Sequence, residues 1–191
     1  MLALQATIKG LSTIHKDLKV KEKQYGKALD ISVRVEGFRL MKVLKQEIRE
    51  GHPGGQSFAP LSVIARRFKK GDEKALKRLA IAIRYNIERN PDISMHIGWT
   101  GPKVSKRWKA LADMHQRGFV TQVTEEILKM LLGRAKATSE PDKRYFFIRK
   151  STRFFRTPPR PIIDPFWAKH GNEARKNIQN NFRMKMAGKR I

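Results

Sequence analysis

The 191-residue chain contains no cysteine. This absence excludes disulfide-stapled folds, thiolate zinc sites, iron–sulfur clusters and cysteine nucleophiles. No apolar run approaches the roughly 18–20 residues that a membrane-spanning helix needs, so we expect no membrane partner. The first residues lack the basic stretch followed by an apolar stretch that marks a signal peptide. We therefore expect the protein to be made and to fold in a cytoplasm.

Acidic residues are scarce, with 17 Asp and Glu against 42 Lys and Arg. The formal net charge is +25 and the pI is near 10.8. An excess of this sign favours polyanionic partners such as nucleic acid, an acidic protein surface or an anionic membrane. The hydrophobic share of 40% is enough for a modest core, which argues against a fully disordered chain. The length fits one domain over residues 1–191.

Patterns that would indicate an enzyme or a metal site are also missing. No two histidines have the His-x3-His spacing, and there is no Gly-x-Ser-x-Gly elbow. The loop 51–57 is rich in glycine but lacks the Lys-Ser/Thr of a phosphate-binding P-loop. We therefore expect no catalytic residue, no metal and no cofactor. A hydrolase that uses dispersed carboxylates stays open only as a remote alternative.

Apolar periodicity predicts a mixed α+β fold. Side chains spaced by three or four residues predict a long helix over about 22–50, ending at Gly51, and a weaker helical pattern covers 3–19. Alternation predicts a hairpin of strands 81–88 and 93–99. The apolar stripe of the long helix consists of Leu29, Val33, Gly37, Leu40, Leu44 and Ile48. We expect a small antiparallel sheet packed by helices, with the N-terminal and C-terminal helices as arms.

Three further helices are predicted from their starts. Ser105 can cap one that ends at Gly118, and Thr121 or Thr124 can cap the next. Asp164 and Pro165 have the residue types of an N-cap and a first helical position. Trp167, Ala174, Ile178 and Phe182 step by seven, four and four residues along this last helix. The domain then divides into an N-terminal helical region at about 1–50, an α+β core over 51–163, and a C-terminal helix and basic tail over 164–191.

Residues 143–160, which directly follow Asp142, combine basic and aromatic side chains and contain no acidic residue. Their two aromatic-rich halves, 144–149 and 152–157, predict strands joined at Lys150-Ser151. Such a segment suits single-stranded nucleic acid, through base stacking and backbone charge. It also suits an ordinary hairpin with an aromatic core face and a basic solvated face. The candidates for contact with DNA or an acidic partner are Lys143, Arg144, Arg149, Lys150, Arg153 and Arg156.

Four short motifs stand in an order that is more informative than any one of them. They are Gly54-Gly55 with Phe58-Ala59-Pro60-Leu61-Ser62, the strand ending at Gly98, His115-Gln116-Arg117-Gly118, and Pro158-Pro159-Arg160-Pro161. In this order and over about residues 25–185, the chain resembles the phage virion morphogenesis family, the tail-completion proteins of tailed phages such as the Mu-like ones.

The resemblance implies a structural role in the virion, at the head-proximal end of the tail. It implies a ring of copies of this chain, commonly six, that caps the tail tube and joins it to the DNA-filled head. The expected partners are the chain itself, tail-tube and neck or head-completion proteins, and passing double-stranded DNA. The alternative function is a non-specific nucleic-acid-binding protein that uses residues 143–160.

Candidate interface residues under this resemblance come from the third and fourth motifs and from the start of the last helix. They are His115, Gln116, Gly118, Arg160, Pro161, Phe166 and Trp167. A simpler interpretation is that Gly118 only ends a helix with His115 packed beneath it. Arg160-Pro161, in the same way, either places the last helix or forms a turn.

Overall fold

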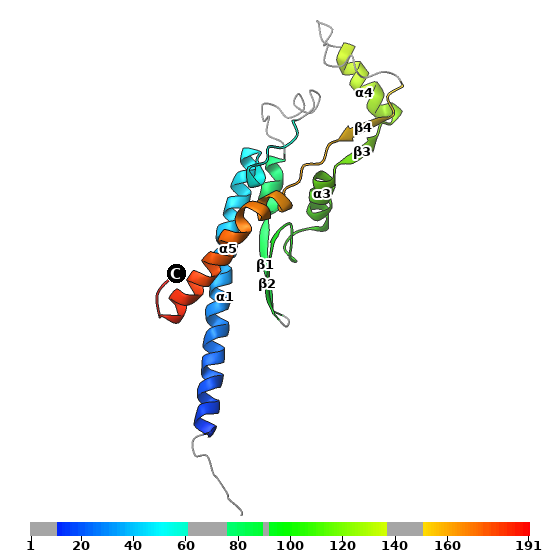
Figure 1. Ribbon diagram of the computed structural model, residues 1–191. Coiled ribbons are helices and arrows are strands. Elements are labelled where there is room, and N and C mark those ends of the chain that lie inside the picture. The colour runs from blue at the N-terminus through cyan, green and yellow to red at the C-terminus, as the bar shows by residue number, and fades with distance from the viewer. Residues whose placement is uncertain (1–10, 61–75, 90–91, 137–150) are drawn as a thin grey trace, which may run out of the picture.

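The computed structural model describes residues 11–60, 76–89, 92–136 and 151–191, and Figure 1 shows an elongated molecule built from helices and two small ribbons. The α+β class is confirmed. In chain order the elements are α1 (Leu11–Glu50), the 3-10 helices η1 (Pro53–Gly55) and η2 (Lys77–Ala82), β1 (Arg84–Arg89), β2 (Ile93–Gly98), α3 (Lys106–Arg117), β3 (Phe119–Gln122), α4 (Glu125–Lys136), β4 (Phe154–Thr157) and α5 (Ile163–Met186).

The first helix is longer than the sequence analysis predicted. It begins at Leu11 rather than near residue 22, so the two predicted helical patterns form one continuous helix of 40 residues, about 60 Å long. Gly26 does not interrupt it. The predicted core stripe is confirmed from Val33 to Ile48, whereas Leu29 is exposed because it lies before the core begins. The C-terminal half of α1 therefore forms one side of the core.

Helix α5 packs antiparallel against this C-terminal half of α1 (Figure 1). At its start it lies directly against η1, where Gly54 has a φ of +64°. A Cβ at Gly54 would lie only 2.1 Å from the carbonyl oxygen of Pro165. The buried core joins α1, η2 and α5 and consists of Leu40, Leu44, Ile48, Ala80, Ile83, Ile162, Phe166 and Ala174.

The predicted hairpin is confirmed as β1 and β2, which pair antiparallel from Arg84 opposite Gly98 to Arg89 opposite Ile93. The hairpin approaches α1 closely at Gly37, where a Cβ would lie 2.7 Å from the Met95 sulfur. At its far end Arg89 Nε donates to Asp30 of α1 at 2.8 Å. The hairpin is thus held to α1 at two points.

A second two-stranded sheet consists of β3 and β4, of which the sequence analysis predicted only β4. The strand predicted over 152–157 is present as β4, but its partner is β3, with Phe119 opposite Thr157 and Gln122 opposite Phe154. The other predicted half, 144–149, lies outside the described residues. Strands β3 and β4 with α4 form an arm that extends away from the α1–α5 core (Figure 1).

Two predicted helix starts are confirmed, and one is wrong. Ser105 accepts a hydrogen bond from the Trp108 amide at 3.4 Å, and Thr124 accepts one from the Ile127 amide at 3.3 Å. Helix α5 starts at Ile163, not after an Asp164 cap. Its buried residues are Pro165, Phe166, His170 and Ala174. Of the four apolar residues that step along it, Ala174 is buried, Ile178 and Phe182 are half-buried, and Trp167 is 39% exposed. None of the described helices has an apolar segment that could cross a membrane.

Replacing Gly54 by alanine is expected to destabilise the fold by several kcal/mol. The new Cβ would meet backbone atoms of α5 that cannot move aside, and the residue would be held at a positive φ that alanine disfavours. The matched control is Gly26→Ala, since no atom lies within 4 Å of that Cβ and alanine favours a helix by about 0.5–1 kcal/mol. Urea unfolding measures both. Equal stability of the two variants would contradict the close approach of η1 and α5.

Candidate assembly interface

Four of the predicted interface residues meet at one junction between the end of α3 and the start of α5. The Arg160 amide donates to the His115 carbonyl oxygen at 2.9 Å. The Ile163 amide donates to the side-chain oxygen of Gln116 at 3.2 Å, which satisfies a free N–H in the first turn of α5. Gly118 has a φ of +74°, and a Cβ there would lie 2.8 Å from the Pro159 nitrogen. All these contacts are made within one chain.

The fourth motif is also connected to the first. Arg160 is only 4% exposed, and its guanidinium donates to the carbonyl oxygens of Ala59 at 3.0 Å and Pro60 at 3.3 Å. Burial lowers the pKa of the Arg160 guanidinium. In the part of the chain that the structure describes, no carboxylate pairs with it. Arg160 therefore fixes the loop after η1 to the segment that leads into α5.

The remaining predicted interface residues differ in exposure. Phe166 is buried in the core against His170, with ring centroids 4.7 Å apart. Pro161 is exposed, and Trp167 is 39% exposed on the first turns of α5. The junction thus presents Pro161 and Trp167 to the outside, while Phe166 and Arg160 hold the core together.

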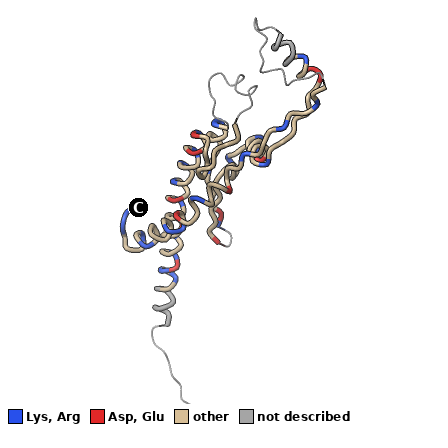
Figure 2. The backbone as a smooth tube through the Cα atoms, turned by 45° about the horizontal axis from the view of Figure 1, so that its top comes forward, with Lys and Arg blue, Asp and Glu red and all other residues tan. Residues whose placement is uncertain are grey.

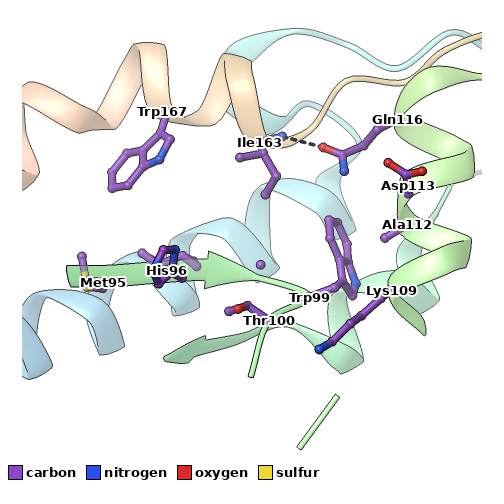
Figure 3. Close-up of a pocket in the computed structure, with 12 residues that line it drawn as sticks. Met95, His96, Trp99, Thr100, Lys109, Ala112, Asp113, Gln116, Ile163 and Trp167 are labelled. Atoms are coloured by element: carbon purple, nitrogen blue, oxygen red, sulfur yellow. Dashed lines mark hydrogen bonds between the residues drawn. The ribbon is translucent and has the colours of Figure 1, made fainter. Parts of the chain in front are cut away.

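An open cleft of about 360 Å³ lies between β2, α3 and the start of α5 (Figure 3). Trp99 lines one side of the cleft, and its indole N–H donates to the Leu79 carbonyl oxygen at 3.0 Å, which fixes the position of the ring. Asp113 on the opposite wall forms an ion pair with Arg117 at 2.9 Å. The residues that line the cleft are Met95, His96, Ile97, Gly98, Trp99, Thr100, Lys109, Ala112, Asp113, Gln116, Ile163 and Trp167.

Sequence reasoning did not single out Trp99 or Asp113, because only the packing of α3 beside β2 brings them to one cleft. The described residues contain no group of three or more His, Asp or Glu that could hold a metal ion. The polar groups that line the cleft are the Trp99 and Trp167 indoles, the Gln116 amide, the paired Asp113 carboxylate, His96, Thr100 and Lys109.

The interface between α1 and α5 contains two buried carboxylates. Glu47 accepts hydrogen bonds from the Gly54 amide at 2.7 Å and the Lys169 ammonium at 3.0 Å, and its Oε1 lies 2.9 Å from His170 Nε2. Burial by itself raises the pKa of Glu47, but the hydrogen bonds from Gly54, His170 and Lys169 outweigh it, so the net pKa is lowered. One side chain thereby joins α1, η1 and α5.

Glu36 is the second buried carboxylate, 11 residues and so three helical turns before Glu47 on the same face of α1. It pairs with Arg39 at 2.7 Å and accepts from the Asn177 amide at 3.3 Å. Arg39 also contacts Glu173 of α5 at 3.2 Å. The order of these partners along α5 fixes the antiparallel register of the two helices.

Two parts of the molecule carry large apolar side chains that no described residue covers. On the N-terminal half of α1 these are Leu18, which is 60% exposed, and Val20. On the arm they are Val120 of β3 and Phe154 of β4, which is also 60% exposed. An isolated two-stranded ribbon is marginally stable in water, so the arm needs a surface to pack on.

The predicted DNA-contact residues are only partly placed. Lys143, Arg144, Arg149 and Lys150 lie outside the described residues. Arg153 and Arg156 are exposed on or beside β4, on either side of Phe154 in sequence. Arg156 stands opposite Val120 in the ribbon. The basic and apolar side chains of the arm are therefore interleaved on one small sheet.

No family model, curated protein or solved structure matches this chain.

Replacing Gln116 by alanine is expected to cost about 1 kcal/mol of unfolding free energy, the usual cost of losing an N-cap. The change removes the acceptor for the Ile163 amide at the start of α5. Gln116→Glu keeps that acceptor and adds a charge that a helix N-terminus favours, so it should retain wild-type stability. Urea unfolding curves measure both variants. A Gln116→Ala variant as stable as Gln116→Glu would show that the cap contributes nothing.

The stability that Glu47 contributes is expected to depend on pH. Its pKa is lower in the folded than in the unfolded chain, so the contribution is complete above the ordinary glutamate pKa of about 4.3 and is lost as the pH falls through the lower folded value. Near pH 7, Glu47→Gln should cost about 3 kcal/mol, because it removes a buried carboxylate that accepts from the Gly54 amide and pairs with Lys169.

Urea midpoints from pH 7 down to pH 2.5 measure this effect. The gap between wild type and Glu47→Gln should narrow as the pH falls below about 4. The control is Glu125→Gln, whose side chain is almost fully exposed, and it should track the wild type. A gap for Glu47→Gln that is constant over the whole range would exclude an ionised carboxylate at this position.

Proposed function

We propose that this chain is a structural, non-enzymatic subunit of a phage virion. In this proposal, copies of it form a ring, with six as the number that the resemblance implies, at the head-proximal end of the tail. The ring caps the tail tube and joins it to the DNA-filled head. Two kinds of support exist: the order of the four motifs along the chain, and the uncovered apolar side chains on two extensions.

The main structural support for the proposal is that two extensions of the molecule expose apolar side chains. The N-terminal half of α1 and the arm of β3, β4 and α4 project from opposite ends of the core (Figure 1). Leu18 and Phe154 are each 60% exposed on thin structures that have no core of their own. An extension at one end that packs on the next copy makes a head-to-tail contact, and such contacts close into rings when the rotation allows.

The charge of the chain supports acidic neighbours. At +25 per copy, a ring of six would carry a formal charge of about +150, which only acidic protein faces or DNA could compensate. In the proposed location, the tail tube and neck proteins adjoin the ring and the DNA passes through it, so both kinds of partner are present.

A specific observation favours the alternative function of nucleic-acid binding. Phe154 is exposed on β4 and stands between Arg153 and Arg156 in the sequence. An exposed aromatic ring beside cations is a stacking platform for single-stranded nucleic acid. The same exposed ring serves the assembly proposal as an apolar contact, so an experiment on Phe154 must read out both mass and nucleic-acid binding.

The test of assembly is the absolute mass of nuclease-treated protein by light scattering at moderate salt. We expect a species near six times 22.1 kDa. The double variant Val120→Ser, Phe154→Ser should fall to the monomer mass, because it removes the apolar contact of the arm. It should keep the wild-type melting temperature of the core, since both side chains are exposed on the arm.

The matched control is Ile81→Ser, which removes a side chain of similar exposure, 61%, from η2 on the core. It should leave the assembled mass unchanged. A wild type that stays monomeric at all concentrations would contradict self-assembly. Loss of single-stranded DNA binding by the double variant, with no change of mass, would favour the alternative function.

A further inference from the structure

We infer that the part of the molecule where the C-terminal end of α5 meets α1 at Tyr25 binds the phosphate backbone of duplex DNA. We call this surface the basic end. It is formed by side chains that are exposed, apart from the half-buried Lys185, and it consists of Lys19, Lys21, Lys23, Lys27, Arg183, Lys185, Lys189 and Arg190. Aromatic contact between Tyr25 and Phe182, with centroids 6.3 Å apart, holds the two helices together there.

The cations of the basic end greatly outnumber the acids near them. Among the residues whose side chains the structure describes, none of the eight forms an ion pair. The acidic residues within 17–29 and 179–191 are Asp17 and Glu22. The nearest acid further along α1, Asp30, is already occupied by Arg34 and Arg89. Figure 2 shows the contrast with the middle of the molecule, where acidic and basic residues are interspersed.

The geometry suits a linear polyanion. Lys19, Lys23 and Lys27 follow one another at intervals of four residues, so they lie along one face of α1, about 6 Å apart in rise. Duplex DNA carries a charge for about every 1.7 Å of its axis, so this row of about 12 Å spans several phosphates. The helix backbone holds the row straight, and the cations of α5 follow Phe182, whose ring contacts Tyr25 within the row.

Neutral donors accompany the cations. Gln24 of α1 and Gln179 and Asn180 of α5 are exposed. Side-chain amides donate to phosphate oxygens and carry no sequence information in that role. The basic end should therefore bind duplexes of any sequence with similar affinity.

An anionic membrane fits this surface less well. A helix that lies on a membrane inserts its apolar face between lipids. On α5, Ala174 is buried in the core and Phe182 contacts Tyr25 of α1. The exposed apolar residues of this end, Leu18 with Val20 and Met184 with Met186, stand two residues apart, so they point to nearly opposite sides of their helices and form no continuous apolar face. The charges and amide donors of the basic end match a phosphate backbone better than a membrane surface.

This binding surface is separate from residues 143–160 and does not depend on assembly into a ring. The test compares two variants of the full chain that each lose four charges. The basic-end variant is Lys19→Gln, Lys23→Gln, Arg183→Gln, Arg190→Gln. The control is Arg78→Gln, Lys103→Gln, Lys106→Gln, Arg107→Gln, whose exposed side chains lie on η2 and around the start of α3.

Binding to a 30-base-pair duplex is measured by fluorescence anisotropy from 50 to 300 mM salt. Because both variants have the same net charge, any non-specific effect of total charge is equal in the two. We expect the basic-end variant to bind at least about tenfold more weakly than the control at physiological salt, and its salt slope to be shallower by about three. Unfolding curves confirm that both variants fold.

A second measurement needs no variant. Acetylation of lysines in the wild-type protein, followed by mass spectrometry, should show Lys19, Lys23 and Lys189 protected when duplex DNA is bound, and Lys103 and Lys106 still reactive. Equal loss of DNA affinity in the two variants, or equal protection of both sets of lysines, would overturn the inference. So would a basic-end variant that keeps its DNA affinity but loses binding to phosphatidylserine vesicles or to polyglutamate, since the surface would then serve a membrane or an acidic protein.

Discussion

The buried carboxylate of Glu47 is the contact on which the rest of the fold depends. It joins the end of α1, the Gly54 amide of η1 and the Lys169–His170 turn of α5 within hydrogen-bond distance of one side chain. Such a carboxylate is costly to bury unless all its neighbours are donors, and here they are. Because it lies beside the tight approach of Gly54 to Pro165, it fixes where α5 begins its path along α1. Glu36 then repeats the arrangement three turns earlier.

This dependence on a polar interface follows from the small size of the core. The buried apolar cluster draws on α1, η2 and α5 and leaves much of the chain outside it. The hairpin β1–β2 is held through Gly37 and Asp30, whereas the second ribbon and α4 extend away from the core. A chain of this shape gives up part of its own burial and leaves apolar side chains exposed, such as Leu18 and Phe154. The proposed ring would cover such side chains with neighbouring copies.

The motifs that carry the family resemblance have a physical basis in the single chain. The absence of a side chain at Gly54 and Gly118 lets the backbone at Pro165 and Pro159 approach closely. Gln116 accepts a hydrogen bond from the first turn of α5, and Arg160 donates to the carbonyl oxygen of Ala59. These residues form one continuous junction across more than 100 positions of sequence. They are therefore positioning residues of the fold. In the proposed ring, the contacts between copies would then fall to the more exposed extensions, which carry none of the four motifs.

The sequence by itself determined what local spacing controls. The stripe from Val33 to Ile48, the caps at Ser105 and Thr124, and the alternation of the first hairpin are all decided within a few residues, and each was predicted correctly. The tertiary structure alone decided the rest. The pairing of β4 with β3, the cap that Gln116 supplies to α5, and the outward position of Trp167 all depend on segments more than 30 residues apart. No local pattern contains that information, because the partner that satisfies each N–H or covers each face comes from elsewhere in the chain.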